Sequence, residues 1–152
     1  MNKNNNSMKS IDILLVEDNP GDVRLTQEVL KEAKVKNELH IVCDGVEAMA
    51  FLRKEGKYKN VSTPDMVLLD LNLPRKSGHE VLNEIKTDEN LKRIPVVILT
   101  VSKDEEDIIK SYNLYANCFI TKPVNLQQFL SVVKSIEDFW LTIVKLPPKE
   151  KA

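Results

Sequence analysis

Three acidic side chains stand where they could share one reactive or metal-binding site. Glu17 and Asp18 end the apolar run that begins at Ile11, and Asp70 ends the run Met66-Val-Leu-Leu-Asp70. Carboxylates that converge repel one another unless a cation neutralises them, and Mg²⁺ takes oxygen ligands of this kind. Taken alone, the three acids predict either a magnesium site or solvated strand ends without a common role.

A hydroxyl group and an ammonium group complete the set. Thr100 ends the apolar run that begins at Pro95, and Lys122 comes directly after the short run from Asn117 to Thr121. A phosphoryl group on Asp70 would lie between the metal ion and Lys122, with the Thr100 hydroxyl as a hydrogen-bond donor. Asp70 would be the nucleophile, and it needs a donor with a good leaving group. The rest of the site would supply positioning and charge neutralisation.

Five short apolar runs alternate with longer amphipathic stretches, which is typical of βα units around a parallel sheet. We therefore predict an α/β fold with five helices and a five-stranded parallel sheet, doubly wound in the flavodoxin-like order 2-1-3-4-5. In this order the first and third strands are neighbours, and ligands bind outside the carboxyl ends of the strands. The acids should therefore meet. The predicted strands cover residues 11–17, 39–43, 66–70, 95–100 and 117–121.

Helix signals frame these strands. Asn19-Pro20 predicts the start of the first helix, with an Asn cap and a proline in the first turn. Ser102 to Glu105 has the spacing of a capping box and predicts the start of the fourth. The last helix, from about Asn125 to Val144, has apolar residues over an arc of roughly 200°, where a surface helix needs only about 100°. Either the Pro147-Pro148 tail or another protein should cover the excess.

Composition limits the classes of function. The chain has 152 residues, enough for one ordinary domain, and 22 Lys+Arg against 23 Asp+Glu, so we expect no direct binding to nucleic acid or anionic lipid. No run reaches the ~20 apolar residues of a membrane span. We predict a disordered tail over residues 1–9, a folded domain over 10–146 and a short tail over 147–152. Cys43 and Cys118 should be buried free thiols, which favours a cytoplasmic setting.

Separate motifs in this order resemble the receiver domain of response regulators over about residues 10 to 140. They are Val16-Glu17-Asp18-Asn19, Leu69-Asp70-Leu71-Asn72-Leu73-Pro74, Leu99-Thr100 and Thr121-Lys122-Pro123. Together they are highly specific, although each alone is weak. The resemblance implies that Asp70 accepts a phosphoryl group. It also implies that Glu17 and Asp18 hold Mg²⁺, with Asp18 the more direct ligand, and that Asn72 contributes its backbone carbonyl.

The resemblance also implies a switch. Lys122 would pair with the phosphoryl group, and the Lys122–Pro123 bond would be cis. The Thr100 hydroxyl would move toward the phosphoryl oxygen while Phe119 turns inward, which changes the face of the fourth helix, fifth strand and last helix. Val101 stands where the family usually has a small residue, and its branched side chain leaves the rates of phosphoryl gain and loss open.

The long loop before the third strand and the extended last helix resemble stand-alone regulators of phytochrome-type histidine kinases. Such a protein would receive its phosphoryl group from a phosphohistidine of a kinase or phosphotransfer protein. It would signal by protein contact, and some regulators of this kind form homodimers through the last-helix face. It would be a phospho-accepting switch with slow self-dephosphorylation, and not an enzyme.

Three other functions share parts of this residue pattern. A phosphohydrolase with an aspartate nucleophile needs an acid two residues later, where this chain has Asn72. A flavodoxin-like cofactor binder must hold phosphate in its first loop, which here is acidic from Glu17 to Asp22 and would repel it. An adaptor that has the receiver fold but is never phosphorylated stays open from the sequence.

Overall fold

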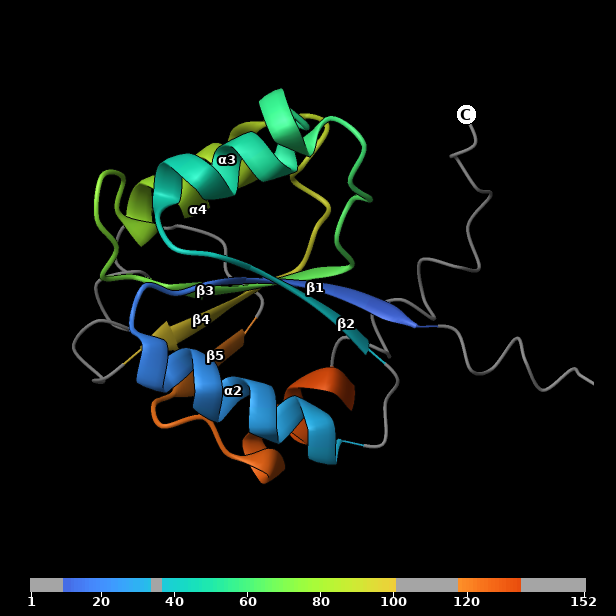
Figure 1. The fold of residues 1–152 in the computed structure, drawn as a ribbon, viewed down its shortest axis with the longest axis vertical. Helices are drawn as coiled ribbons and strands as arrows, with labels where there is room; N and C mark the ends of the chain where they lie inside the picture. Colours follow the sequence, from blue (N-terminus) through green and yellow to red (C-terminus); the bar gives the residue numbers. More distant parts are fainter. Residues whose placement is uncertain (1–9, 34–36, 101–117, 135–152) are drawn as a thin grey trace, which may run out of the picture.

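Five parallel strands form one sheet at the centre of the computed structural model, which describes residues 10–33, 37–100 and 118–134 (Figure 1). The order is β2-β1-β3-β4-β5, so the predicted order is confirmed. β3, which ends at Asp70, therefore lies in the middle of the sheet, between β1 and β4. The strands are β1 (Ile11–Val16), β2 (Asn37–Val42), β3 (Met66–Asp70), β4 (Val96–Thr100) and β5 (Cys118–Thr121).

Helices cover both faces of this sheet, as a doubly wound fold requires. α3 and α4 lie on one face, and α2 lies on the other together with the helical segment over residues 126–134 (Figure 1). A short 3₁₀ turn, η1 (Gly56–Tyr58), follows α3 within the long loop before β3. The three labelled helices are α2 (Pro20–Glu32), α3 (Gly45–Leu52) and α4 (Gly78–Thr87).

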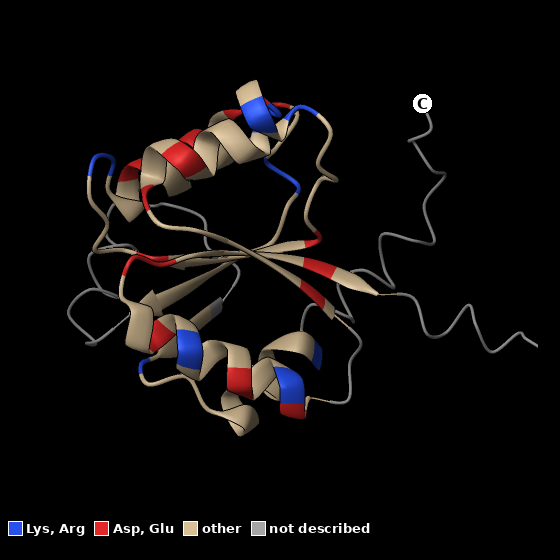
Figure 2. Cartoon of the chain, viewed as in Figure 1, with Lys and Arg blue, Asp and Glu red and all other residues tan. Residues whose placement is uncertain are grey.

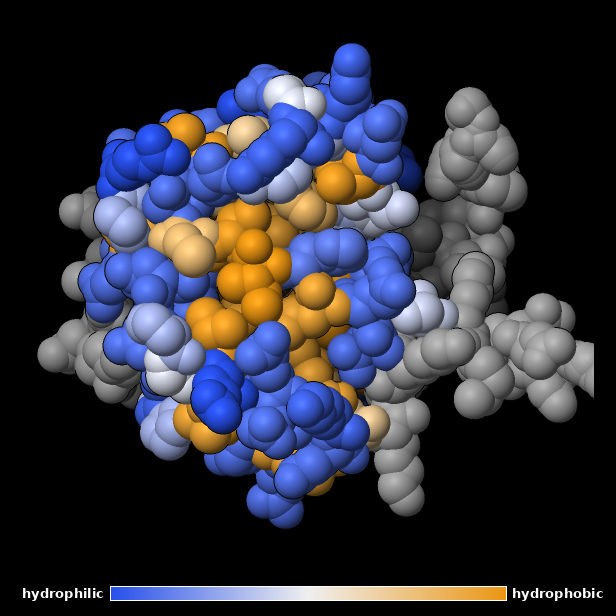
Figure 3. Space-filling model, viewed as in Figure 1, coloured by the Kyte–Doolittle hydropathy of each residue, from blue (hydrophilic) through white to orange (hydrophobic). Residues whose placement is uncertain are grey.

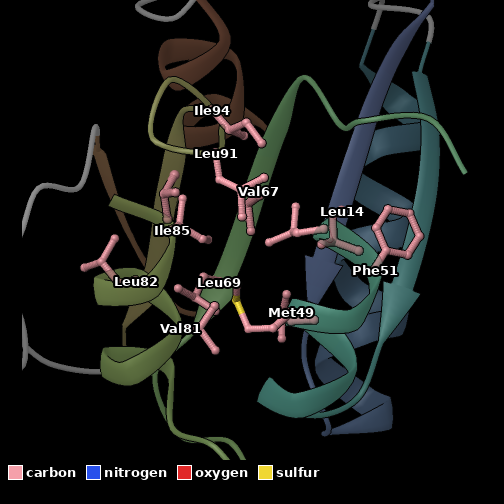
Figure 4. Packing of buried hydrophobic residues seen from close by; sticks show 14 of the residues in the cluster. Leu14, Met49, Phe51, Val67, Leu69, Val81, Leu82, Ile85, Leu91 and Ile94 are labelled. Carbon is pink, nitrogen blue, oxygen red and sulfur yellow. The ribbon is translucent and has the colours of Figure 1, made fainter. Parts of the chain in front are cut away.

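Each face of the sheet has its own core. Successive strand side chains point to opposite faces, so one strand serves both cores. Figure 4 shows the core under α3 and α4, which contains Leu14, Val67, Leu69, Met49, Phe51, Val81, Leu82, Ile85, Leu91 and Ile94. The other core joins Ile13, Leu15 and Leu68 to Val29 and Leu30 of α2 and to Phe129, Val132 and Val133. This burial on both faces explains why β3 and β4 are almost continuously apolar.

Side-chain caps fix the helix starts close to the carboxyl ends of the strands. The Asn19 side chain accepts a hydrogen bond from the Asp22 backbone N–H at 3.0 Å, and Pro20 is the first residue of α2, as predicted. Ser77 and Glu80 form a capping box at the start of α4. The loops after β1 and β3 therefore each end in a side-chain cap at the start of the helix that follows.

The edge strand β2 differs from the sequence-based expectation. It begins at Asn37, two residues before the predicted start, because Asn37 pairs with Ile11 in the parallel register. Cys43 lies beyond the end of β2 and is exposed, so its predicted burial was wrong. The apolar strand before Cys43 ends in a bend, and this bend carries the thiol out of the core. The side chain of Cys118 lies outside the described part of the chain.

Apolar side chains gather on the surface over β2, between α2 and α3 (Figure 3). Each of these three elements carries one large exposed apolar side chain, namely Leu25, Ile41 and Val46. The helical segment over residues 126–134 carries a fourth, Leu130. Among the described helices, none combines the length and apolar character that a membrane crossing requires.

Several predictions fall on residues that the structure does not describe. They are the tail over residues 1–9, the predicted fourth helix with Val101, the second half of the last helix and the tail over residues 147–152. The predicted apolar excess of the last helix is therefore described only up to residue 134. Within that part, Phe129, Val132 and Val133 are buried and Leu130 is exposed.

Candidate functional site

The predicted acidic residues meet at the carboxyl end of the sheet, where acidic ribbon segments lie close together (Figure 2). β1 and β3 are paired neighbours, with Val16 opposite Leu69, so the residues that end these strands lie side by side. Glu17, Asp18 and Asp70 can each offer one carboxylate oxygen within 4.8 Å of the other two. Glu17 and Asp70 are buried, whereas Asp18 is exposed, so the cluster opens to solvent on one side.

Lys122 lies at the centre of this cluster. Its Nζ is 2.9 Å from Oε1 of Glu17 and 3.1 Å from Oδ2 of Asp70. Only 11% of the Lys122 side chain is exposed, so these contacts are little screened by water. A third carboxylate, from Asp22 in the first turn of α2, lies 3.1 Å from the same Nζ. The sequence did not indicate this contact, because Asp22 lies 100 residues from Lys122 and has an ordinary role at a helix start.

The cluster changes the protonation of its own members. Burial and the hydrogen bond with Asp70 raise the pKa of Glu17 to about 7, although Lys122 acts in the opposite direction. Burial lowers the pKa of Lys122, but the contacts with Glu17 and Asp22 and the charge of Asp70 outweigh this and raise the pKa above its usual value. Lys122 is therefore a permanent cation, and Glu17 changes its charge near neutral pH.

The oxygen atoms of this cluster fit a hard divalent cation. Within the described residues, Oε1 of Glu17 is buried without a hydrogen bond of good geometry, although it forms an ion pair with Lys122. The second oxygen of Glu17 accepts from the Asn19 N–H at 3.2 Å, and Oδ1 of Asp70 accepts from the Asn72 N–H at 3.1 Å. Backbone groups thus hold the carboxylates in place while their other lone pairs stay available to a metal ion.

The remaining predicted residues stand on the strands beyond Asp70. Thr100 ends β4 at the same end of the sheet, and its side chain lies outside the described part. Phe119 on β5 is partly buried and packs against the core under α3 and α4. The Lys122–Pro123 bond is cis, as the resemblance implied. The structure therefore brings Lys122 to Asp70 and places Phe119 one strand further from the cluster than Thr100.

The sequence did not predict a role for two residues near Asp70, namely Gly78 and Arg75. Gly78, the first residue of α4, donates its N–H to the Leu71 carbonyl at 3.0 Å, and α4 begins directly against the β3 end. Arg75 has a left-handed backbone with φ 67° and binds both oxygens of Asp44, at 3.0 and 3.3 Å. The loop after Asp70 is thereby joined to the starts of both α3 and α4. The sequence signal for the packing of α4 against β3 was Gly78, a glycine directly after the Ser77 cap.

The chain is similar to known proteins in both sequence and structure. The chain matches the response regulator receiver domain over residues 13–134. Response regulator Rcp1 of Synechocystis sp. is 55% identical over 135 residues, which cover 89% of this chain and 92% of Rcp1. The phosphorylated cyanobacterial phytochrome response regulator RcpA is 56% identical, with a TM-score of 0.73 over 91% of this chain and 99% of RcpA. The Mn²⁺-bound form of Rcp1 is 54% identical, with a TM-score of 0.71 over 90% and 99%.

The domain match covers most of the chain, and Rcp1 is similar along nearly its whole length. The strand order 2-1-3-4-5 agrees with the similarity to the solved structure of RcpA. This chain belongs to the response regulator receiver domain family, and its relatives include stand-alone phytochrome response regulators.

Proposed function

We propose that this protein is a single-domain response regulator that accepts a phosphoryl group on Asp70. The observation that carries this proposal is the ion pair between Oδ2 of Asp70 and Nζ of Lys122, 3.1 Å long, inside a cluster of carboxylates that can hold a metal ion. Asp70 lies on the middle strand and is held by the Asn72 N–H, so it is a fixed nucleophile. Its own side chain is buried, and the exposed Asp18 opens the cluster to solvent.

The metal ion would be Mg²⁺, held by Glu17, Asp18 and Asp70 together with the backbone carbonyl of Asn72. Oxygen donors of this kind suit Mg²⁺, and the relative Rcp1 has a Mn²⁺-bound form. When bound, the ion supplies positive charge beside the phosphoryl oxygens. Opposite it, Lys122 supplies a second positive charge, and the two would share the negative charge that builds up during transfer.

The phosphoryl donor would be a phosphohistidine on a histidine kinase or a phosphotransfer protein. In the transfer, an Asp70 carboxylate oxygen forms a bond to phosphorus while the bond between phosphorus and the donor imidazole nitrogen breaks. The electron pair of the broken bond stays on the imidazole, which takes up a proton. Relatives that are named phytochrome response regulators support a photoreceptor kinase as the partner.

The response to phosphorylation would pass along β4 and β5. Thr100 and Phe119 would rearrange around the phosphoryl group and alter the face of the fourth helix, β5 and last helix, where a partner or a second copy would bind. The phosphoryl group adds charge and acceptor oxygens, which favour one of two packings of the same residues. The protein would act in the cytoplasm as a switch, and it would lose its phosphoryl group slowly by its own hydrolysis.

The test is a mass measurement of the intact protein after incubation with acetyl phosphate and Mg²⁺. We expect one phosphoryl adduct on the wild type and none on Asp70→Asn. Asp88→Asn is a matched control, because Asp88 is a partly buried acid at the end of α4, away from the cluster, and it should keep the adduct. An equal adduct on Asp70→Asn would place the acceptor elsewhere. Failure of the wild type to react would favour the unphosphorylated adaptor.

A further inference from the structure

Among the described residues, Asp22 is the one carboxylate in contact with Lys122 that does not belong to the metal-binding group. Its Oδ2 accepts a hydrogen bond from Nζ of Lys122 at 3.1 Å, yet the group that can hold a metal ion consists of Glu17, Asp18 and Asp70. Its backbone N–H is already bound by the Asn19 cap. The backbone of Asp22 thus takes part in the helix cap, while its side chain contacts Lys122.

The ammonium group of Lys122 donates hydrogen bonds to Asp22 and Asp70, both at 3.1 Å, and forms an ion pair with Glu17 at 2.9 Å. A phosphoryl oxygen that approaches Lys122 therefore competes with carboxylates that already lie against its Nζ. A carboxylate that it displaces must be able to return to water or to find another cation.

Exposure decides which carboxylate gives way. The side chains of Glu17 and Asp70 are 1% and 6% exposed, whereas that of Asp22 is 35% exposed. Glu17 would lose an ion pair inside the protein, which is costly for a buried charge, and Asp70 is the acceptor that stays bonded to the phosphoryl group. Asp22 would regain hydration on leaving Lys122, so its departure costs the least.

On this basis, which rests on the proposed function, we propose that Asp22 is a positioning residue that holds Lys122 in the unphosphorylated protein and releases it to the phosphoryl oxygen. Asp22 then competes with the incoming phosphoryl group for Lys122. Asp22 consequently lowers the affinity of the site for a phosphoryl group, and its removal should raise that affinity.

The experiment is an equilibrium titration with beryllium fluoride in the presence of Mg²⁺, followed by ¹⁹F NMR. Beryllium fluoride binds a carboxylate oxygen as a tetrahedral stand-in for a phosphoryl group, so it reports affinity without transfer kinetics. We expect Asp22→Asn to bind it about three- to tenfold more tightly than the wild type, the range for one charge-assisted contact that is partly exposed. A merely structural role would predict weaker binding, because a damaged site holds the analogue less well.

Glu28→Gln is the matched control. It removes the same charge from α2, but Glu28 contacts Lys31 at 3.9 Å and its side chain is 59% exposed. It should bind beryllium fluoride as the wild type does, and both variants should keep the wild-type melting temperature within a few degrees. Equal or weaker binding by Asp22→Asn, or equal tightening by Glu28→Gln, overturns the role of Asp22. Absence of Mg²⁺-dependent binding to the wild type instead overturns the proposed function itself.

Discussion

Gly78 lies directly against the backbone of Asp70. A Cβ atom at Gly78 would be 2.3 Å from the Asp70 carbonyl oxygen and 2.5 Å from Cα of Leu71, both of which are main-chain atoms that cannot rotate away. The first residue of α4 and the proposed phosphoacceptor are therefore packed as closely as a side chain of one hydrogen atom allows.

We predict that Gly78→Ala lowers the free energy of unfolding by about 2–3 kcal/mol, because the new methyl group must push α4 and β3 apart. Urea denaturation measures this change. Gly21→Ala is the control, since its Cβ would meet only the Asn19 side chain, at 3.2 Å, and its effect should stay below about 1 kcal/mol. Similar stability of Gly78→Ala and the wild type would show that α4 can retreat freely from Asp70.

Glu17 should give the stability of the metal-free protein a distinct pH dependence. Its pKa in the folded protein is raised from 4.5 to about 7, so the folded state holds the proton more tightly than the unfolded state. The resulting stability is present below pH 4.5 and is lost as the pH rises through about 7. Glu17→Gln keeps the neutral form at every pH, so it should gain on the order of 1–3 kcal/mol relative to the wild type across this window.

Chemical denaturation at several pH values in the presence of EDTA tests the prediction for Glu17. The control is Glu89→Gln, which removes a carboxylate that is 84% exposed and should follow the wild type at every pH. A constant difference between Glu17→Gln and the wild type from pH 4 to 8 would contradict the raised pKa.

Lys122→Met should destabilise the protein because it leaves three carboxylates without their shared cation. We expect a loss of about 3–5 kcal/mol in metal-free buffer, the range for breaking a buried ion pair by removing one partner. Added Mg²⁺ should restore part of the loss by neutralising the same acids. Lys92→Met is the control, since Lys92 contacts exposed Glu89 at 3.2 Å and its loss should cost less than about 0.5 kcal/mol. No response of Lys122→Met to Mg²⁺ would speak against a metal site at these acids.

Substitutions at Arg75 distinguish the cost of its left-handed backbone from the loss of its ion pair with Asp44. Its φ of 67° is costly for any residue with a Cβ, so Arg75→Gly should have a higher urea midpoint than Arg75→Ala, although both lose the contact with Asp44. At the exposed helical position Asn83 the order should reverse, with Ala more stable than Gly. The same order at both positions would mean that Arg75 is not held in the left-handed conformation in solution.

Local pattern was enough to predict elements whose ends coincide with a change of side-chain type. β3 was predicted to the residue, because its apolar run stops at Asp70. The start of α2 was predicted from Asn19 and Pro20, which act within a single turn. β2 was placed less well, because an edge strand begins where its neighbour offers main-chain partners, and Asn37 shows no apolar signal.

The candidate site likewise contains residues that the sequence predicts and contacts that it does not. Glu17, Asp18, Asp70 and Lys122 could be predicted because each follows a strand, and all strands of a parallel sheet end at one edge. The contact of Asp22 with Lys122 could not, because it depends on the orientation of α2 against the loop after β5. The exposure of Cys43 depends likewise on a bend that no residue type specifies.

Because the chain is synthesised from its N-terminus, Lys122 is added after the acids that it contacts. Lys122 follows Asp70 by 52 residues and Asp22 by 100. A nascent chain therefore carries all of the acids well before their cation, and the carboxylates stay mutually repulsive until β5 docks beside β4. The charge balance of this centre therefore depends on the last strand pair, which brings the cation to the acids.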